Sequence, residues 1–202
     1  MITIVDYGMG NIGSIANMIK YLGGTSEITA DIETIRSATK IILPGVGSFD
    51  FAMQKLKSLN LIDVLNEKAL EEKIPILGIC LGMQLLSNGS DEGTEGGLKW
   101  IDAQVIKFDE SKEFRIPNMG WNYVKQEKKS QLFTYKDPET RFYFVHSYYM
   151  KCNQKEDILF TSNHGIDYTC AVEANNIYGV QFHPEKSHRF GKELLNNFLK
   201  LC

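Results

Sequence analysis

The alternation of short apolar runs with helical patterns in the first half of the chain is the feature that most constrains the fold. Apolar runs with strand character occupy residues 2–7, 40–43 and 74–80, and helical spacing of apolar side chains occupies residues 13–22, 51–59, 61–72 and 83–87. Strands that are separated by helices imply a parallel sheet with helices on both faces. The first half therefore predicts an α/β fold with three layers.

The second half of the chain has a different pattern. Strand-like runs follow one another, with polar or glycine-containing breaks, at 100–108, 123–126, 141–149, 158–161, 168–173 and 177–182. Little helical pattern lies between them, so antiparallel or mixed pairing is expected, and a helical pattern closes the chain at 190–201. We predict a mixed, mainly parallel central sheet with an antiparallel extension, built from residues 1–202 as a single domain.

Composition and charge exclude several classes of protein. The 202 residues are 43% hydrophobic and carry a net charge of −3, which gives no basic footprint for nucleic acid and no polybasic patch for a membrane surface. No apolar stretch approaches the ~20 residues of a membrane span, and the first residues do not resemble a signal peptide. The cysteines at positions 80, 152, 170 and 202 are too far apart for a Cys-x-x-Cys pair, so no metal is expected. The expected location is cytoplasmic, with reduced thiols.

The segment from Ile76 to Gln84 points most directly to chemistry. An apolar strand runs into Gly-Ile-Cys-Leu-Gly at 78–82 and then into a helical pattern, which is the nucleophile-elbow pattern with cysteine in place of serine. The glycines permit a sharp, strained turn that lifts the Cys80 sulfur above the strand end. The following helix N-terminus favours the thiolate, and its N–H groups can stabilise an oxyanion. The alternative is a structural cysteine in a glycine-rich turn, because free cysteines are often buried.

A base for this nucleophile is available near the end of the chain. His183 stands at the end of an apolar strand pattern, and its neutral ring can take a thiol proton and return it to a leaving amine. Glu185 lies two residues later, so on an extended backbone it points the same way and can orient the ring as the third member of a triad. The other histidines, at positions 146, 164 and 188, are interpreted as hydrogen-bonded polar side chains.

Two glycine-containing loops follow strand patterns. Residues 44–47, Pro-Gly-Val-Gly, can present backbone N–H groups at the sheet edge where ligands bind, which predicts an oxyanion wall facing Cys80. Without Cys80, an ordinary strand–helix turn would be the simpler interpretation. Residues 8–13 have the Gly-x-Gly-x-x-Gly spacing of a dinucleotide-binding loop, but only Glu27 stands near the distance at which that motif needs an acidic residue.

The combination of the elbow at 78–84 with His-Pro-Glu at 183–185 resembles the class I, triad-type, glutamine amidotransferase family. The resemblance covers essentially the whole chain and implies the family's three-layer, flavodoxin-like fold. It also implies that Cys80 attacks the side-chain amide of glutamine, that His183 shuttles the proton and that Glu185 orients His183. A glutamyl thioester forms, ammonia leaves and water releases glutamate, without a cofactor. The family pattern further assigns the oxyanion to Gly45, Val46 and Leu81, and the substrate to Gly47, Gln84, His146, Ser147 and Tyr148.

Further segments narrow the resemblance to one branch of the family, the glutaminase subunits of imidazole glycerol phosphate synthase. They are Asp-Tyr-Gly-Met-Gly-Asn at 6–11, Pro-Gly-Val-Gly at 44–47, Met-Gly-Trp-Asn at 119–122, Phe-Val-His-Ser-Tyr at 144–148 and His-Pro-Glu-Lys-Ser at 183–187. The branch implies a heterodimer with a (β/α)8-barrel cyclase subunit, which takes ammonia through a sealed interface and uses it in histidine biosynthesis. Residues expected near that interface are Met9, Asn11, Trp121, Tyr143 and Lys186.

Some features keep alternatives open. Asn118 stands where the family often has histidine, and Cys152 together with residues 187–191 resembles a paralogous branch that supplies ammonia for amidation of a surface-polysaccharide sugar. That alternative keeps the glutaminase chemistry and changes the acceptor. A non-catalytic binding module on the same fold is a third hypothesis, against which the intact Cys80, His183 and Glu185 argue. A cysteine hydrolase acting on peptides or esters is a fourth, disfavoured by Gln84 and residues 44–47.

Overall fold

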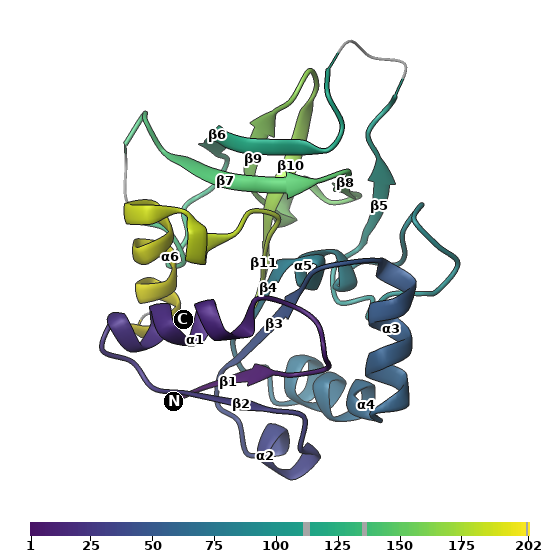
Figure 1. Cartoon of the computed structure of the whole chain (residues 1–202), viewed down its shortest axis with the longest axis vertical. Coiled ribbons are helices and arrows are strands. Elements are labelled where there is room, and N and C mark those ends of the chain that lie inside the picture. Colours follow the sequence, from purple (N-terminus) through teal and green to yellow (C-terminus); the bar gives the residue numbers. More distant parts are fainter. Residues whose placement is uncertain (111–113, 135–136, 201) are drawn as a thin grey trace.

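One eleven-stranded sheet forms the centre of the molecule (Figure 1). The computed structural model describes residues 1–110, 114–134, 137–200 and 202. The strands β2, β1, β3, β4 and β11 lie side by side in this order and all run parallel. Their bounds are Ser26–Thr29, Ile2–Val5, Ile41–Gly45, Ile76–Cys80 and Ile177–Val180.

The sheet continues from β11 with antiparallel strands in the order β10, β9, β6 and β7. Two further strands lie off this path, since β8 pairs with β10 and β5 pairs with β8. The bounds are Ala103–Lys107 for β5, Asn118–Gln126 for β6, Arg141–His146 for β7, Tyr148–Cys152 for β8, Ile158–Asn163 for β9 and Asp167–Ala174 for β10. The predicted mixed sheet with a parallel core and an antiparallel extension is confirmed.

Helices cover both faces of the parallel strands (Figure 1). They are α1 (Ile12–Tyr21), α2 (Ile32–Arg36), α3 (Phe49–Ser58), α4 (Leu61–Asn66), α5 (Leu81–Leu85) and α6 (His188–Lys200). Neighbouring strand residues point to opposite faces. Leu43 accordingly packs in a cluster with residues of α2 to α5, whereas Ile42 packs in a second cluster with residues of α1 and α6. Two cores separated by one sheet give the predicted three layers.

Several element boundaries differ from the sequence expectations. The short edge strand β2 and helix α2 were not predicted, because residues 26–29 are half-buried or exposed and show no buried apolar run. The single strand expected at 141–149 is broken at Ser147, which lets β7 pair with β6 while β8 pairs with β5. The helix expected at 61–72 changes to a π-helical turn at Glu67–Glu71. The predicted last helix is present to Lys200, and position 201 lies outside the described residues.

The helices are also short. Among the described residues, none forms a helix long and apolar enough to cross a lipid bilayer.

Candidate active site

Cys80 sits at a strained turn between β4 and α5. Its backbone has φ 56° and ψ −112°, which is a rare conformation for a residue with a side chain. Close packing explains the glycines on either side: a Cβ at Gly82 would lie 1.8 Å from the Leu43 carbonyl oxygen, and a Cβ at Gly78 would lie 2.6 Å from the Gly82 carbonyl oxygen. The predicted nucleophile elbow is therefore confirmed in its geometry.

The helix after the elbow begins earlier and is shorter than expected. It starts at Leu81, directly after Cys80, and has five residues. A helix dipole is the sum of aligned peptide dipoles, so a helix of this length supplies only part of the field of a long helix. The electrostatic environment of the sulfur must therefore come largely from neighbouring side chains.

His183 and Glu185 form a buried pair beside this turn. His183 Nδ1 lies 2.9 Å from Glu185 Oε1, and the two side chains are 3% and 1% exposed. The backbone N–H of His183 donates to the Tyr143 carbonyl at 2.9 Å, and the Ser187 hydroxyl donates to the His183 carbonyl at 2.6 Å. The expected extended backbone is wrong, because residues Pro184–Lys186 form one 3₁₀ turn, yet the carboxylate still reaches the ring.

The environment of His183 determines its charge. Burial alone lowers the pKa of the ring, but its interactions with Cys80 and with Glu185 outweigh burial and raise the pKa to about 9. Among the described residues, His183 Nε2 is buried without a hydrogen-bond partner that meets geometric criteria. With Nδ1 held by the carboxylate, Nε2 is the ring atom left to exchange a proton with the sulfur or with a ligand.

A cavity of about 290 Å³ opens over the Cys80 sulfur. It brings together two of the three predicted triad residues with predicted oxyanion and substrate residues from four separate segments. The predicted residues in its lining are Val46, Gly47, Cys80, Leu81, Gln84, His146, Ser147, Tyr148 and His183. Glu185 lies behind His183, and Gly45 lies in β3 opposite Cys80 in the pairing of β3 with β4, outside the lining.

His146 differs in character from the other lining residues. Its Nδ1 lies 2.8 Å from the Tyr148 carbonyl oxygen, and the Asn118 amide lies 3.0 Å from its Nε2. Burial lowers the pKa of the ring to about 4, so it stays neutral, donating from Nδ1 and accepting at Nε2. Both ring nitrogens are engaged, so the structure gives His146 the task of holding the backbone at Tyr148.

The loop at residues 44–47 is held from the side of the β1–α1 loop. The Tyr7 hydroxyl donates to the Pro44 carbonyl at 2.6 Å, and Tyr7 is buried. Gly47 has φ +102°, and a Cβ there would lie 2.9 Å from Cε of Met9. The backbone next to the sulfur is therefore in contact with the loop that carries Met9 and Asn11.

Two polar residues of this region were not predicted as site residues. Glu92 lines the cavity, and its Oε2 accepts a hydrogen bond from the backbone N–H of Phe49 at 2.8 Å. No motif singles it out, because it lies in an irregular segment after α5. Gln181 lies fully buried with its side chain toward Cys80. Its position two residues before His183, on the same strand face, was the signal available for it.

The residues expected at a partner interface border the same site on two sides. Met9 contacts the 44–47 loop, and Tyr143 accepts a hydrogen bond from the His183 backbone. Trp121 packs edge-on against Tyr143 with ring centroids 6.2 Å apart and stacks on His188 at 5.2 Å. Lys186 lies over the Tyr143 ring, with Nζ 6.0 Å from its centroid.

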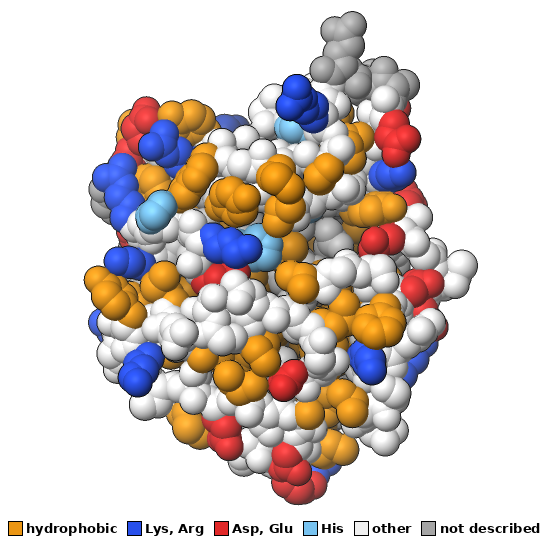
Figure 2. Space-filling model, viewed as in Figure 1, with side chains coloured by type: hydrophobic (Ala, Val, Ile, Leu, Met, Phe, Trp, Pro, Cys, Tyr) orange, Lys and Arg blue, Asp and Glu red, His pale blue; other side chains and the backbone are white. Residues whose placement is uncertain are grey.

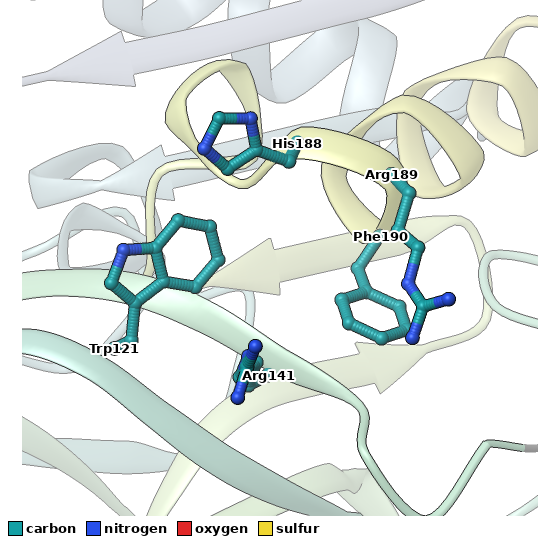
Figure 3. Close-up of a pocket in the computed structure, with 5 residues that line it drawn as sticks. All are labelled: Trp121, Arg141, His188, Arg189 and Phe190. Carbon is teal, nitrogen blue, oxygen red and sulfur yellow. The ribbon is translucent and has the colours of Figure 1, made fainter.

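The surface around Trp121 is apolar with a basic rim. Met119, Trp121 and Tyr123 alternate along β6 and are 62%, 41% and 53% exposed. Hydrophobic side chains gather over β6 and β7 in Figure 2, flanked by basic ones. A cavity of about 540 Å³ lies beside Trp121, and Figure 3 shows that its lining comes from β6, β7 and the start of α6. Its lining residues are Trp121, Arg141, His188, Arg189 and Phe190.

Comparison with known proteins places this geometry in a family. The sequence model described as Glutamine amidotransferase class-I matches residues 3–202. The chain is 57% identical over 200 residues to the imidazole glycerol phosphate synthase subunit HisH 2 of Methanococcus maripaludis, covering 99% of both chains. It is 45% identical over 201 residues to the protein of the same name from Pseudomonas aeruginosa, covering 100% of both chains.

Solved structures agree in fold. A putative GMP synthase component from Thermoplasma acidophilum matches with a TM-score of 0.71 at 24% identity, over 98% of this chain and 91% of that chain. The PurLQS structure from Thermotoga maritima matches with a TM-score of 0.72 at 18% identity, over 98% and 96%. At these identities the likeness concerns the fold alone. Together with the full-length sequence match, it leads to one conclusion: the chain belongs to the class I glutamine amidotransferase family.

Proposed function

We propose that the chain hydrolyses glutamine to glutamate and ammonia and is the glutaminase subunit of an imidazole glycerol phosphate synthase. The observation that carries the chemistry is the cavity in which a strained cysteine meets a histidine that is paired with a buried carboxylate at 2.9 Å. The pathway is supported by the name of the relative that is 57% identical over 99% of both chains. Residues 1–202 would act as one domain, in the cytoplasm, where thiols stay reduced.

The proposed reaction has two halves. The Cys80 thiolate attacks the carbonyl carbon of the glutamine side-chain amide, and the charge that develops on the oxygen is stabilised by backbone N–H groups at Val46 and Leu81, next to Gly45. Protonated His183 gives its proton to the nitrogen, so ammonia leaves and a glutamyl thioester remains. His183 then takes a proton from water, which attacks the thioester and releases glutamate.

Glu185 has a supporting part in this scheme. Its carboxylate fixes the ring through Nδ1 and favours the protonated form that the first half requires. A buried histidine without such a partner would lose its proton, because burial disfavours the charged ring.

Substrate recognition would use the opposite wall of the cavity. Gly47, Gln84, Ser147 and Tyr148 line it and supply backbone and side-chain polar groups for the amino-acid end of glutamine. We assign the α-ammonium group to Glu92, whose carboxylate is held by the Phe49 N–H and is the acidic group in the lining. His146 would contribute by holding Tyr148 in place and not by direct contact.

The ammonia would pass to a (β/α)8-barrel cyclase subunit docked on the surface that carries Trp121, Tyr143 and Lys186, with Met9 and Asn11 on its other side. Exposed apolar side chains in a row, with aromatic and basic residues among them, are typical of a protein interface. Direct transfer preserves reactivity, because free ammonia would be protonated in bulk water.

Capture of the partner from extract of the source cells, followed by mass spectrometry and reconstitution, tests this function. A cyclase should co-purify, and the purified pair should form imidazole glycerol phosphate from glutamine. We expect low glutaminase activity in the isolated chain and a large increase with the acceptor-loaded cyclase, because partner binding can shift the 44–47 loop into its active conformation. Equal turnover with and without the cyclase would contradict that expectation. A sugar-modifying synthetase as the sole partner would contradict the pathway and leave the glutaminase chemistry in place.

A further inference from the structure

Gln181 lies directly behind the nucleophile and has no part in the mechanism described so far. Its side chain is fully buried, and it follows β11, whose parallel pairing with β4 places Val180 opposite Ile79. The next positions along the two strands are Gln181 and Cys80, so the two side chains leave the sheet at the same edge. The backbone N–H of Gln181 donates to the Cys170 carbonyl at 2.9 Å, which fixes the residue at this place.

A chain of hydrogen bonds determines which end of the Gln181 amide faces the sulfur. Gln84 Nε2 lies 3.3 Å from the Tyr148 carbonyl oxygen and 3.0 Å from Gln181 Oε1. A backbone carbonyl only accepts, so Gln84 must turn its NH₂ group toward Tyr148. The same NH₂ group meets Gln181, which must therefore present its carbonyl oxygen to Gln84 and its own NH₂ group to the other side.

That NH₂ group points at Cys80. Gln181 Nε2 lies 3.9 Å from the Cys80 Sγ, within the longer range of hydrogen bonds to sulfur. A thiolate accepts such a bond more strongly than a thiol, because hydrogen bonds to a charged partner are the stronger ones. The donor would therefore favour the charged form of the sulfur.

The other cysteines show why such a donor is needed. Burial raises the pKa of Cys152 to about 12 and raises that of the fully buried Cys170 well above its ordinary value. Cys80 is itself buried, with 7% of its surface exposed, and the helix that follows it has only five residues. A reactive thiolate in this place must be stabilised by neighbouring groups, and the structure places His183 and Gln181 next to it.

We propose that Gln181 is a positioning residue that donates a hydrogen bond to the Cys80 thiolate, and that Gln84 holds its amide in the donating orientation. The proposal rests on the glutaminase function proposed above. It also limits how Gln84 can meet a substrate: both of its amide hydrogens are used within the protein, so it offers the ligand only its Oε1 as an acceptor.

The pH dependence of Cys80 alkylation tests this role. Iodoacetamide is applied to the full chain between pH 5.5 and 9.5, and modification at Cys80 is followed by peptide mass spectrometry. Gln181→Met removes the donor and keeps a side chain of similar length. We expect alkylation at pH 7 to be about tenfold slower, with the midpoint of the profile about one pH unit higher and the plateau at high pH unchanged.

The matched control is Gln126→Met. Gln126 also uses its amide inside the protein, donating to the Lys128 and Phe133 carbonyls at 2.8 and 3.2 Å, but it lies on β6 away from the sulfur. Its profile should equal that of the wild type. A purely structural role of Gln181 would lower the melting temperature without moving the midpoint of the profile.

An unchanged midpoint in folded Gln181→Met would overturn the proposal. If that variant does not fold, Gln84→Leu provides the second test: it releases the Gln181 amide and should shift the midpoint in the same direction by a smaller amount, and an unshifted midpoint again overturns the proposal. Failure of the glutaminase function itself would look different, because wild-type Cys80 would then react no faster than Cys152, Cys170 and Cys202.

Discussion

The parallel and antiparallel parts of the sheet contribute different things to the site. Every residue of β1, β3, β4 and β11 is buried, and these strands end at the elbow and at the segment leading to His183. On β6, buried or half-buried residues alternate with exposed ones, and Trp121 stands on the open face. The comparison teaches that a sheet packed on both faces fixes the reacting atoms, while a sheet with one open face can supply a wall and a docking surface.

The largest expected effect comes from removing the nucleophile on the parallel side. Cys80→Ala should reduce glutamine-dependent synthesis by about 10⁴-fold or more, because the thioester cannot form. Synthesis from added ammonium chloride should persist, since the cyclase surface is untouched. The measurement is imidazole glycerol phosphate formation by the reconstituted pair. Loss of both activities would assign Cys80 a role in folding or docking instead.

Glu185→Gln is expected to have the next largest effect. An amide can still contact the ring, but it removes the charge that holds the ring protonated, so activity should fall by about 10²- to 10⁴-fold. The pKa of His183 should drop from about 9, measured by NMR of labelled histidine. Retention of the wild-type value would mean that Cys80 alone sets the charge of His183.

A pair of glycine substitutions tests how tightly the parallel side is packed. Gly82→Ala places a Cβ 1.8 Å from the Leu43 carbonyl oxygen and should destabilise the fold by roughly 4 kcal/mol. Gly13→Ala, within α1, meets nothing within 4 Å and should stabilise it by roughly 0.5–1 kcal/mol. Urea unfolding measures both. Similar values for the two variants would show that the elbow can relax around a methyl group.

The open face of the antiparallel part is tested by an aromatic pair. Trp121→Ala should weaken binding to the cyclase by about 2 kcal/mol, roughly 30-fold, as expected for a central aromatic at an interface. Phe51→Ala removes a ring that is 50% exposed on α3, on the parallel side, and should leave the affinity unchanged. Isothermal titration with the purified cyclase gives both values. Equal affinities for the two variants would place the docking surface elsewhere.

The smallest effect expected is a pH dependence of stability. The folded-state pKa of His183, about 9, lies above its ordinary value of 6.5, so protonation favours the folded state. This contribution is complete below pH 6.5 and is lost as the pH rises through 9. Urea unfolding of the wild type from pH 6.5 to 9.5 should therefore show a decline. In Glu185→Gln the decline should be smaller, and an equal decline would trace it to another group.

Much of the site could be predicted because local patterns carry it. The strand–Gly-x-Cys-x-Gly–helix pattern requires a tight turn wherever the chain folds, so Cys80 could be placed from sequence. His183 and Glu185 are two residues apart, and the carboxylate reaches the ring even though the backbone between them is not extended. The β2 strand and the break at Ser147 escaped prediction, because short exposed segments carry little hydrophobic signal.

The sequence by itself determined the alternation of strands and helices, the elbow at Cys80 and the short-range pair of His183 with Glu185, because each depends on residues near one another in the chain. Only the tertiary structure decided which distant groups meet. Glu92 enters the cavity, His146 has both ring nitrogens engaged, and Gln181 faces Cys80 across 101 positions of sequence. Those contacts depend on the pairing of β4 with β11 and on the wall beside β7 and β8, which no local pattern specifies.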